Sequence, residues 1–298
     1  MSAPATGDAP LRFEYDETLE QARERNIRDA LLEDVGRGDW TGQLLPSQRR
    51  VKAQVRVREA AVLAGRAWFD GVMQAVAGGT RVHWRYDEGA TMTADSVVCD
   101  LDGQARALFT AERPALNFLQ LLSGTASMTR AHVQAIAGAS PNPRGCAVLD
   151  TRKTIPGLRQ AQKYAVRVGG GGNQRLALWD GILNKENHIA AAGGVTPALQ
   201  RAQSLHAGVG IQIEVETLDQ LREALAAGAT SVLLDNFSLA RMREAVAIVG
   251  GRALLEASGG LGLEGLRDVA ATGVDRISIG RLTKDVRAID YSMRVLPD

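Results

Sequence analysis

The sequence contains very little cysteine, and its charges nearly cancel. Cys99 and Cys146 are the 2 cysteines among 298 residues, too few for the disulfide framework of a small secreted protein. The 35 Lys and Arg residues against 34 Asp and Glu residues leave a formal net charge of +1. Because binding to nucleic acid or to a membrane surface depends on excess positive charge, the composition supports neither partner. We therefore expect a protein of a reducing compartment, the cytoplasm.

Long apolar runs and grouped metal ligands are also missing. No uncharged apolar run approaches the roughly 20 residues that span a bilayer. The start, MSAPATGDAP, lacks the basic and apolar regions of a signal peptide and predicts a short disordered tail. The four histidines are scattered, and none stands at zinc-site spacing from a cysteine. The remaining chain has 45% hydrophobic residues, enough for a large core, and its length predicts about two domains.

The first part of the chain mixes helical periodicity with strand alternation. Helices are predicted over residues 16–35, 68–77 and 114–136, and strands over residues 51–57 and 82–86. Strands of this kind interleaved with helices predict an antiparallel sheet with helices, which is α+β in character. The turn-rich segment 138–143 then indicates a joint between two domains.

The second part alternates short apolar runs with amphipathic helices. The apolar runs are residues 147–149, 181–183, 211–215, 231–234, 253–255 and 276–279, and helices begin near residues 158, 196, 217, 239 and 263. This alternation implies parallel strands connected by helices. Six such strands can form either a barrel or an open, doubly wound sheet.

The position of the polar residues favours the barrel. Each predicted strand is followed, or ended, by polar or glycine residues: Asp150–Lys153, Lys185–His188, Glu214 with Glu216, Asp235–Asn236, Ser258–Gly260 and Gly280–Arg281. Parallel barrels build their sites from the loops after every strand, whereas an open sheet concentrates them at one switch point. The region is shorter than an eightfold barrel, so we expect an incomplete barrel of six or seven strands.

One segment, residues 149–188, concentrates cations. Arg152, Lys153, Arg175 and Lys185 lie at two strand exits that are joined by a helix and a run of four glycines. Arginine grips carboxylate or phosphate through a planar fork, and lysine supplies a point charge. The segment therefore predicts a pocket for a small substrate that carries two kinds of anionic group. The glycine run follows a helix rather than a strand, so it indicates a helix stop and not a dinucleotide-binding loop.

Several long motifs carry a resemblance to a known family. The motifs, in chain order, are ALLEDVGRGDWT, TAERPALNFLQLLSGTAS, DTRKTIPGLRQAQKYAVRVGGG, KENHI, IEVETL, LLDNF, LEASGGL and ISIGRLTK. Together they resemble the quinolinate phosphoribosyltransferases, the decarboxylating nicotinate-nucleotide pyrophosphorylases, over nearly the whole chain. The resemblance implies transfer of phosphoribosyl from phosphoribosyl pyrophosphate to quinolinate with loss of carbon dioxide. The products would be nicotinate mononucleotide and diphosphate, in the de novo synthesis of NAD.

The resemblance also implies an architecture and an assembly. The expected α/β fold joins an N-terminal α+β open-faced sandwich, residues 12–124, to a C-terminal incomplete parallel α/β barrel, residues 125–284. A tail of residues 285–298 is expected to pack back on the N-terminal domain. The family forms homodimers in which the partner subunit completes each active site.

Residue roles follow from the same resemblance. For quinolinate, it implies binding by Arg152, Gln174 and Arg175, and by Arg113 of the other subunit. For catalysis, it implies Lys153, Lys185, Glu214 and Asp235, the last two also near Mg²⁺, directly or through water. For phosphoribosyl pyrophosphate, it implies Thr151, Lys153, Lys185, Glu214, Asp235, Ser258, Gly259, Gly260, Ile279, Gly280, Arg281 and Lys284. Magnesium prefers oxygen ligands and keeps several waters, so few protein carboxylates are needed.

Some positions stay open from the sequence alone. Glu214 and Glu216 fall on the same face of a strand, so spacing does not choose between them. Gln174 stands where the family usually has histidine, and an amide can donate a hydrogen bond but carries no charge. Arg281 either contacts phosphate or points into solvent. Arg113 precedes Pro114 at a predicted helix start, where a cation gains nothing from the helix dipole, so a ligand explains it better.

Three other functions compete with this interpretation. The first is a related phosphoribosyltransferase that acts on nicotinate or another heteroaromatic acid, and the second is a non-catalytic sensor of phosphoribosyl pyrophosphate. The third, a structural barrel that binds phosphate, accounts for neither the three arginines nor the two acids.

Overall fold

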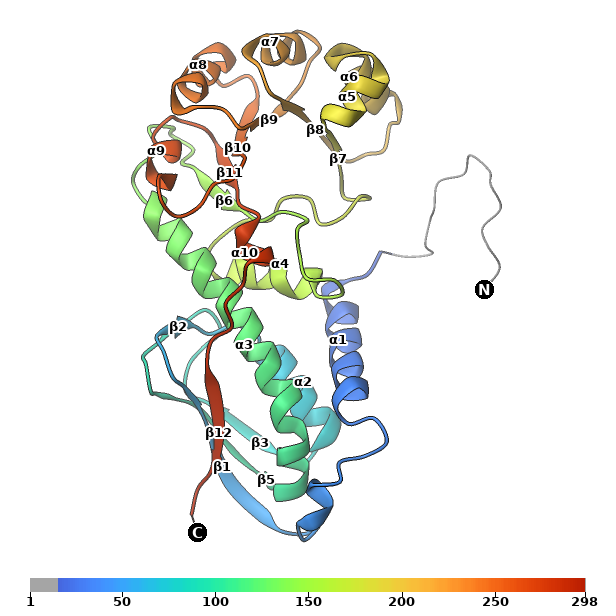
Figure 1. Ribbon diagram of the computed structural model, residues 1–298, viewed down its shortest axis with the longest axis vertical. Coiled ribbons are helices and arrows are strands. Elements are labelled where there is room, and N and C mark those ends of the chain that lie inside the picture. The colour runs from blue at the N-terminus through green and yellow to red at the C-terminus, as the bar shows by residue number, and fades with distance from the viewer. Residues whose placement is uncertain (1–15, 298) are drawn as a thin grey trace, which may run out of the picture.

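The computed structural model describes residues 16–297, so the tail predicted for the first ten residues lies outside it. Figure 1 shows a lower α and β part and an upper arc of strands ringed by helices, joined along one long helix. The N-terminal elements are α1 (Leu19–Asp34), η1 (Gly42–Leu44), β1 (Arg50–Val57), β2 (Ala61–Val62), α2 (Arg66–Val76), β3 (Arg81–Trp84), β4 (Thr91–Met92), β5 (Val97–Gln104) and α3 (Ala105–Ile136). The C-terminal elements are β6 (Ala147–Leu149), α4 (Arg159–Val168), β7 (Gly181–Asn184), α5 (Glu186–Ala192), α6 (Val195–Ser204), β8 (Gly210–Val215), α7 (Leu218–Ala226), β9 (Ser231–Asp235), α8 (Leu239–Val249), β10 (Leu254–Ser258), α9 (Leu266–Ala270), β11 (Arg276–Ser278), α10 (Arg281–Lys284) and β12 (Tyr291–Val295).

The N-terminal part is a four-stranded sheet packed against helices. Its strand order is β12-β1-β5-β3, and the described pairs are antiparallel. In β1 the alternate residues Val51, Ala53, Val55 and Val57 are buried, as the alternation in the sequence predicts. The last strand, β12, comes from the C-terminal segment and pairs with β1, so both ends of the chain contribute to this sheet.

The long helix α3 differs from its prediction. The sequence predicts a start at Pro114, because proline is favoured in the first helical turn, but α3 begins at Ala105 and Pro114 lies inside it. Proline removes one backbone hydrogen bond of the helix, yet the buried neighbours Ala111 and Ala115 hold this stretch in the core. Arg113 therefore sits within a helix and not at its N-terminus.

The C-terminal part is a six-stranded parallel sheet curved into an incomplete barrel. The strand order is β6-β11-β10-β9-β8-β7, and no pairing joins β6 to β7 among the described strands. Figure 1 shows α5 to α9 around the outside of this arc. The predicted fold class, an α+β domain followed by an incomplete parallel α/β barrel, is confirmed. No helix of residues 16–297 is both long and apolar enough to cross a membrane.

Candidate active site

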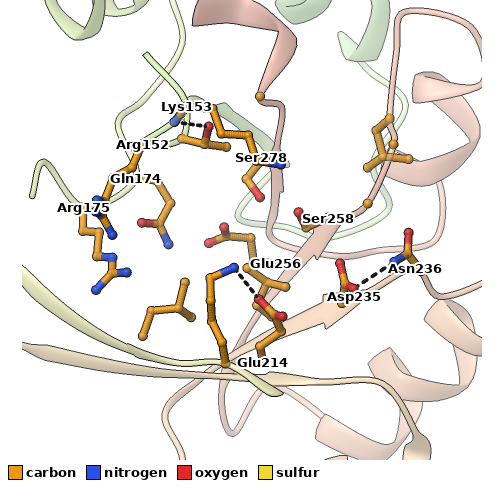
Figure 2. A pocket seen from close by; sticks show the side chains of 18 of the residues that line it. Arg152, Lys153, Gln174, Arg175, Glu214, Asp235, Asn236, Glu256, Ser258 and Ser278 are labelled. Atoms are coloured by element: carbon orange, nitrogen blue, oxygen red, sulfur yellow. Dashed lines mark hydrogen bonds and ion pairs between the residues drawn. The ribbon is translucent and has the colours of Figure 1, made fainter. Parts of the chain in front are cut away.

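The carboxyl ends of the six parallel strands surround a cavity of about 750 Å³. Fourteen of the site residues that the resemblance implies and seven further residues line it: Thr151, Arg152, Lys153, Gln174, Arg175, Leu183, Lys185, Glu186, Glu214, Leu233, Asp235, Asn236, Glu256, Ser258, Gly259, Gly260, Leu261, Ser278, Gly280, Arg281 and Lys284. Figure 2 shows the arginines on one side of the cavity and Glu214, Asp235 and Ser258 on the other. The barrel therefore brings together cations and acids that are far apart in sequence.

Two arginines face the cavity without an acid between them. Arg175 donates to the carbonyl of Gly181 at 2.8 Å, which fixes its guanidinium at the start of β7. Burial lowers the pKa of Arg175, and the like charge of Arg152 lowers it further. The buried Nε of Arg152 has no hydrogen-bond partner among the described residues. Two partly buried like charges repel each other, so an anion between them would relieve both the repulsion and the missing hydrogen bond.

A buried ion pair holds the loop that carries Arg175. Lys163 Nζ lies 2.5 Å from Asp150 Oδ1, and the two side chains are 2% and 0% exposed. Asp150 also accepts from the backbone N–H of Gln174 at 3.0 Å, and Lys163 donates to the Gln174 carbonyl at 2.8 Å. Burial raises the pKa of Asp150 and lowers that of Lys163, while the opposite charge of each partner counteracts the shift. The pair thus fixes the backbone of Gln174 from both sides.

The glycine run ends α4, as the sequence predicts. Gly169 is the C-cap residue of α4, and a Cβ there would lie 2.6 Å from the Cβ of Thr129 on α3. Glycine therefore lets the chain pass close to α3 before it turns toward the cavity.

Lysine and two acids lie on the opposite wall. Lys185 Nζ is 3.4 Å from Glu214 Oε2, and the Glu214 side chain is only 8% exposed. Burial raises the pKa of Glu214, a hydrogen bond with the Glu186 carboxyl raises it further, and Lys185 opposes both effects. Asp235 follows on the adjacent strand, β9. Glu216 is exposed and does not line this cavity, so the structure places Glu214 in the position that the sequence left open.

Glycine loops close the part of the cavity after β10 and β11. Gly259 has φ +110°, and a Cβ there would lie 2.2 Å from Asn236 Oδ1, so this backbone requires glycine. A Cβ on Gly280 would lie 3.1 Å from the Lys153 side chain. Thr283 on α10 donates to the Lys153 carbonyl at 2.8 Å, which ties the loop after β6 to the loop after β11.

Two predicted residues do not line the cavity. The Ile279 side chain is 1% exposed in the barrel core, and its N–H donates to the Leu149 carbonyl at 2.9 Å. This residue supports Gly280 rather than facing the cavity. Arg113 is exposed on the N-terminal half of α3, which packs in the other domain.

Several residues of the site escaped the sequence reasoning. Glu256 and Gln212 are buried at 0% and 7% exposure, and Ser278 lines the cavity. Strand alternation holds a signal for the first two, because Gln212 lies two residues before Glu214 and Glu256 two before Ser258. Within residues 16–297, no group of three or more His, Cys, Asp and Glu residues is placed to hold a metal ion.

Comparisons with known proteins agree with this geometry. A family described as quinolinate phosphoribosyl transferase matches with its N-terminal domain over residues 39–123 and its C-terminal domain over residues 125–294. The nicotinate-nucleotide pyrophosphorylase (carboxylating) of Mycobacterium leprae is 42% identical over 274 residues, covering 90% of this chain and 95% of that relative. A quinolinate phosphoribosyltransferase (decarboxylating) of Nicotiana tabacum is 33% identical over 290 residues, which cover 90% of this chain and 81% of that relative.

The solved structures give the same result. The nicotinate-nucleotide pyrophosphorylase of Francisella tularensis superposes with a TM-score of 0.88 at 40% identity and covers 94% of this chain and 98% of its own. That of Ehrlichia chaffeensis has a TM-score of 0.86 at 34% identity and covers 92% and 98%. Sequence motifs, both domain matches and the whole-chain superpositions agree, and the chain belongs to the quinolinate phosphoribosyltransferase family.

Proposed function

We propose that this protein transfers the phosphoribosyl group of phosphoribosyl pyrophosphate to quinolinate and releases diphosphate and carbon dioxide. The observation that carries the proposal is the pair of arginines, Arg152 and Arg175, which face one cavity with no acid between them. The same cavity holds lysines, acids and glycine loops suited to a sugar phosphate. The product would be nicotinate mononucleotide, a precursor of NAD.

The arginine side of the cavity suits a dicarboxylate. Quinolinate is a planar pyridine with two adjacent carboxylates, and two guanidinium groups can each take one carboxylate through paired N–H donors. Gln174, between them and the barrel interior, can add a further N–H. A monocarboxylate such as nicotinate would leave one of the two like charges unneutralised.

The other side of the cavity suits phosphoribosyl pyrophosphate. Lys153 and Lys185 supply point charges for the diphosphate, together with Thr151 and the exposed Lys284. Successive backbone amides in glycine turns form concavities that bind phosphate, and residues 258–260 and Gly280 have that character. In parallel barrels, a phosphate site commonly lies after consecutive late strands, as β10 and β11 are here. Arg281 lines this region with a side chain that is 61% exposed.

The chemistry needs positioning and electrostatics more than a general base. The pyridine nitrogen attacks the anomeric carbon while the bond from that carbon to the diphosphate oxygen breaks. Positive charge develops on the ribose, where Glu214 or Asp235 stabilises it, and negative charge develops on the diphosphate beside Lys153 and Lys185. The positive charge on the resulting pyridinium nitrogen then stabilises the electron pair left on the adjacent ring carbon when its carboxylate leaves as carbon dioxide, and that carbon takes up a proton from water to give nicotinate mononucleotide.

Magnesium fits the donor set of this cavity. Glu214 and Asp235 present carboxylate oxygens from neighbouring strands, and Mg²⁺ is typically held by one or two carboxylates, water and substrate phosphate. These two residues would hold it, directly or through water. When bound, the ion would neutralise charge on the diphosphate.

We also propose a homodimer in which Arg113 reaches the partner's cavity. Ten large apolar side chains of residues 16–297 are exposed, and two groups of them lie near the residues concerned: Leu44 and Phe109 beside the exposed face of α3, at 82% and 37%, and Leu178 and Trp179 just after Arg175, at 71% and 46%. Phe109 stands one helical turn before Arg113. In a twofold-symmetric dimer, the apolar group at Leu44 and Phe109 of each copy would pack against the group at Leu178 and Trp179 of the other copy.

We further propose the cytoplasm as the compartment of this protein. Both cysteines, Cys99 and Cys146, are unpaired, as is usual in a reducing compartment.

The test is diphosphate release by the purified protein with phosphoribosyl pyrophosphate, Mg²⁺ and either quinolinate or nicotinate. The proposal predicts release with quinolinate and a much lower kcat/KM with nicotinate. A higher kcat/KM with nicotinate would identify nicotinate as the acceptor. If no heteroaromatic acid leads to release of diphosphate, the protein binds phosphoribosyl pyrophosphate as a non-catalytic sensor.

A further inference from the structure

A row of polar side chains crosses the barrel interior next to the cavity. Gln174 Nε2 donates to Gln212 Oε1 at 2.7 Å, and Gln212 Nε2 donates to Glu256 Oε2 at 3.0 Å. The same Glu256 oxygen lies 3.6 Å from Arg276 Nε, and Arg276 donates to Ser231 Oγ at 2.8 Å. The row thus joins the loop after α4 to strands β8, β10, β11 and β9. Figure 2 shows Gln174 and Glu256, the two residues of this row that line the cavity; Gln212, which connects them, is not labelled there.

The carboxylate gives the row a direction. An ionised carboxylate only accepts hydrogen bonds, whereas the amide of glutamine can present either its NH₂ or its oxygen. Next to Glu256, Gln212 must turn its NH₂ toward the carboxylate, which leaves its oxygen toward Gln174. Gln174 must in turn present its NH₂ to Gln212. One fixed charge therefore determines the orientation of two neutral amides.

The orientation of Gln174 matters because this residue lines the cavity. Its backbone is held by Asp150 and Lys163, so the remaining freedom is rotation of the side-chain amide. With the observed orientation, one N–H goes to Gln212 and a second N–H remains on the same nitrogen. A flipped amide would place a carbonyl oxygen where a donor stands now, and an oxygen repels a substrate carboxylate.

The stability of the fold does not explain why the buried residue 256 is a glutamate. Its side chain is 1% exposed, and its second oxygen, Oε1, has no hydrogen-bond partner among the described residues. The Nε of Arg276 also lacks one, and both residues line a second, smaller cavity of about 140 Å³ on the amino-terminal side of the sheet. A buried carboxylate with an unused acceptor destabilises a fold, so its presence points to a role outside stability.

We propose that Glu256 is a positioning residue for the acid substrate. Its carboxylate orients Gln212 and, through it, Gln174, so that Gln174 offers an N–H to a carboxylate of the substrate. The inference rests on the proposed function, since it assigns Gln174 to the quinolinate end of the cavity. It adds that binding of this acid depends on the charge of Glu256, which acts on Gln174 through Gln212.

Moving the charge along the row tests this inference. The variant Glu256→Gln keeps the shape of the side chain but removes the charge, so both amides are free to flip. The double variant Gln212→Glu with Glu256→Gln places the carboxylate next to Gln174 and again requires an N–H from that residue. Glu244→Gln, on the exposed outer face of α8, is the matched control for loss of one carboxylate.

The readout is the KM for each substrate in the diphosphate-release assay, with thermal unfolding to show that each variant is folded. Glu256→Gln should raise the KM for quinolinate by about tenfold or more, the usual effect of one charge-assisted hydrogen bond. The KM for phosphoribosyl pyrophosphate should stay within about twofold, and the double variant should regain most of the quinolinate affinity.

The outcomes separate this inference from the proposed function. The inference alone is overturned if the wild-type protein is active but Glu256→Gln leaves the KM for quinolinate unchanged. It is also overturned if the variant raises the KM for quinolinate and the KM for phosphoribosyl pyrophosphate equally. A folded double variant that stays as weak as the single one also overturns it, because the charge would then be needed at residue 256 itself. A wild-type protein without quinolinate-dependent release overturns the proposed function and this inference together.

Discussion

At the scale of single residues, the proposed function makes the shape of the cavity's cations as important as their charge. Arg152 and Arg175 come from different loops, yet the fold points both into one cavity. The guanidinium group presents two parallel N–H donors, which match the two oxygens of a carboxylate, whereas the lysine ammonium has no such fork. Arginine-to-lysine exchange therefore separates fork geometry from charge.

We expect Arg152→Lys and Arg175→Lys each to lower kcat/KM for quinolinate by about 10²-fold, because one paired interaction with a carboxylate is lost in each variant. Initial rates of diphosphate release at varied quinolinate concentrations give this number. Arg222→Lys, on the outer surface, is the control and should match the wild-type protein. Wild-type kcat/KM in both cavity variants would show that the arginines do not bind the acid.

At the scale of elements, a buried ion pair supports the loop between α4 and β7. Lys163 on α4 and Asp150 after β6 fix the backbone of Gln174, and Asn173 Nδ2 adds a hydrogen bond to Asp150 at 2.6 Å. Removing one member of a buried pair leaves the other charge without a partner, which is more destabilising than the loss of a surface pair. The position of this loop and the stability of the barrel are therefore linked.

We expect Lys163→Met to lower the free energy of unfolding by about 3–5 kcal/mol at neutral pH. The loss should shrink as the pH falls. Burial raises the pKa of Asp150, so the folded state holds a proton at pH values where the unfolded state has released it, and lower pH then favours folding. Urea unfolding at two pH values measures both effects.

The control for this prediction is Arg222→Met, which breaks only exposed ion pairs and should change stability by less than about 1 kcal/mol. Adding Asp150→Asn to Lys163→Met should recover part of the lost stability, because no buried charge then remains. An equal loss at both pH values would argue against an uncompensated Asp150 charge.

The sequence predicts the main elements for clear physical reasons. Strict alternation marks β1, and short apolar runs separated by amphipathic helices mark the parallel strands, because period and burial are linked. Polar residues at strand ends converge because parallel strands end at one rim, so most of the cavity follows from position in the sequence. The start of α3 is missed because proline is typical of a first helical turn, whereas core packing here keeps Pro114 inside a helix that begins at Ala105.

The rest of the site depends on contacts between distant segments. Alternation places Gln212 and Glu256 on the same strand faces as Glu214 and Ser258, but the hydrogen bonds that join them to each other and to Gln174 link distant segments, which spacing does not reveal. Ile279 lies in a motif of the site, but strand geometry turns its side chain into the barrel core. The place of Arg113 relative to a cavity is a property of an assembly, and a single chain does not specify it.

At the scale of the whole molecule, the two domains share elements at both ends. The helix α3 passes from one hydrophobic core to the other, and β12 returns from the barrel to the N-terminal sheet. Arg113 lies in the N-terminal domain, exposed and outside the cavity lining of its own chain. If it binds the acid substrate, it does so in a second copy.

Mixing variants tests this shared site. Arg113→Ala and Lys185→Ala should each be nearly inactive as pure proteins, because every site lacks one cation. In a mixed dimer, one of the two sites combines both intact residues, so activity should return to about a quarter of the wild-type value after random exchange of subunits. Diphosphate release after mixing, unfolding and refolding measures it. No recovery in mixtures shown to exchange subunits would mean that each chain works alone.

The central claim is that one cavity holds an aromatic dicarboxylate beside phosphoribosyl pyrophosphate and joins them with loss of a carboxylate. Quinolinate carrying ¹³C in its 2-carboxylate tests this claim most directly. With phosphoribosyl pyrophosphate and Mg²⁺ present, the account predicts one labelled carbon dioxide for each diphosphate released. Diphosphate release with the label retained in the product, or loss of label without phosphoribosyl pyrophosphate, would contradict it.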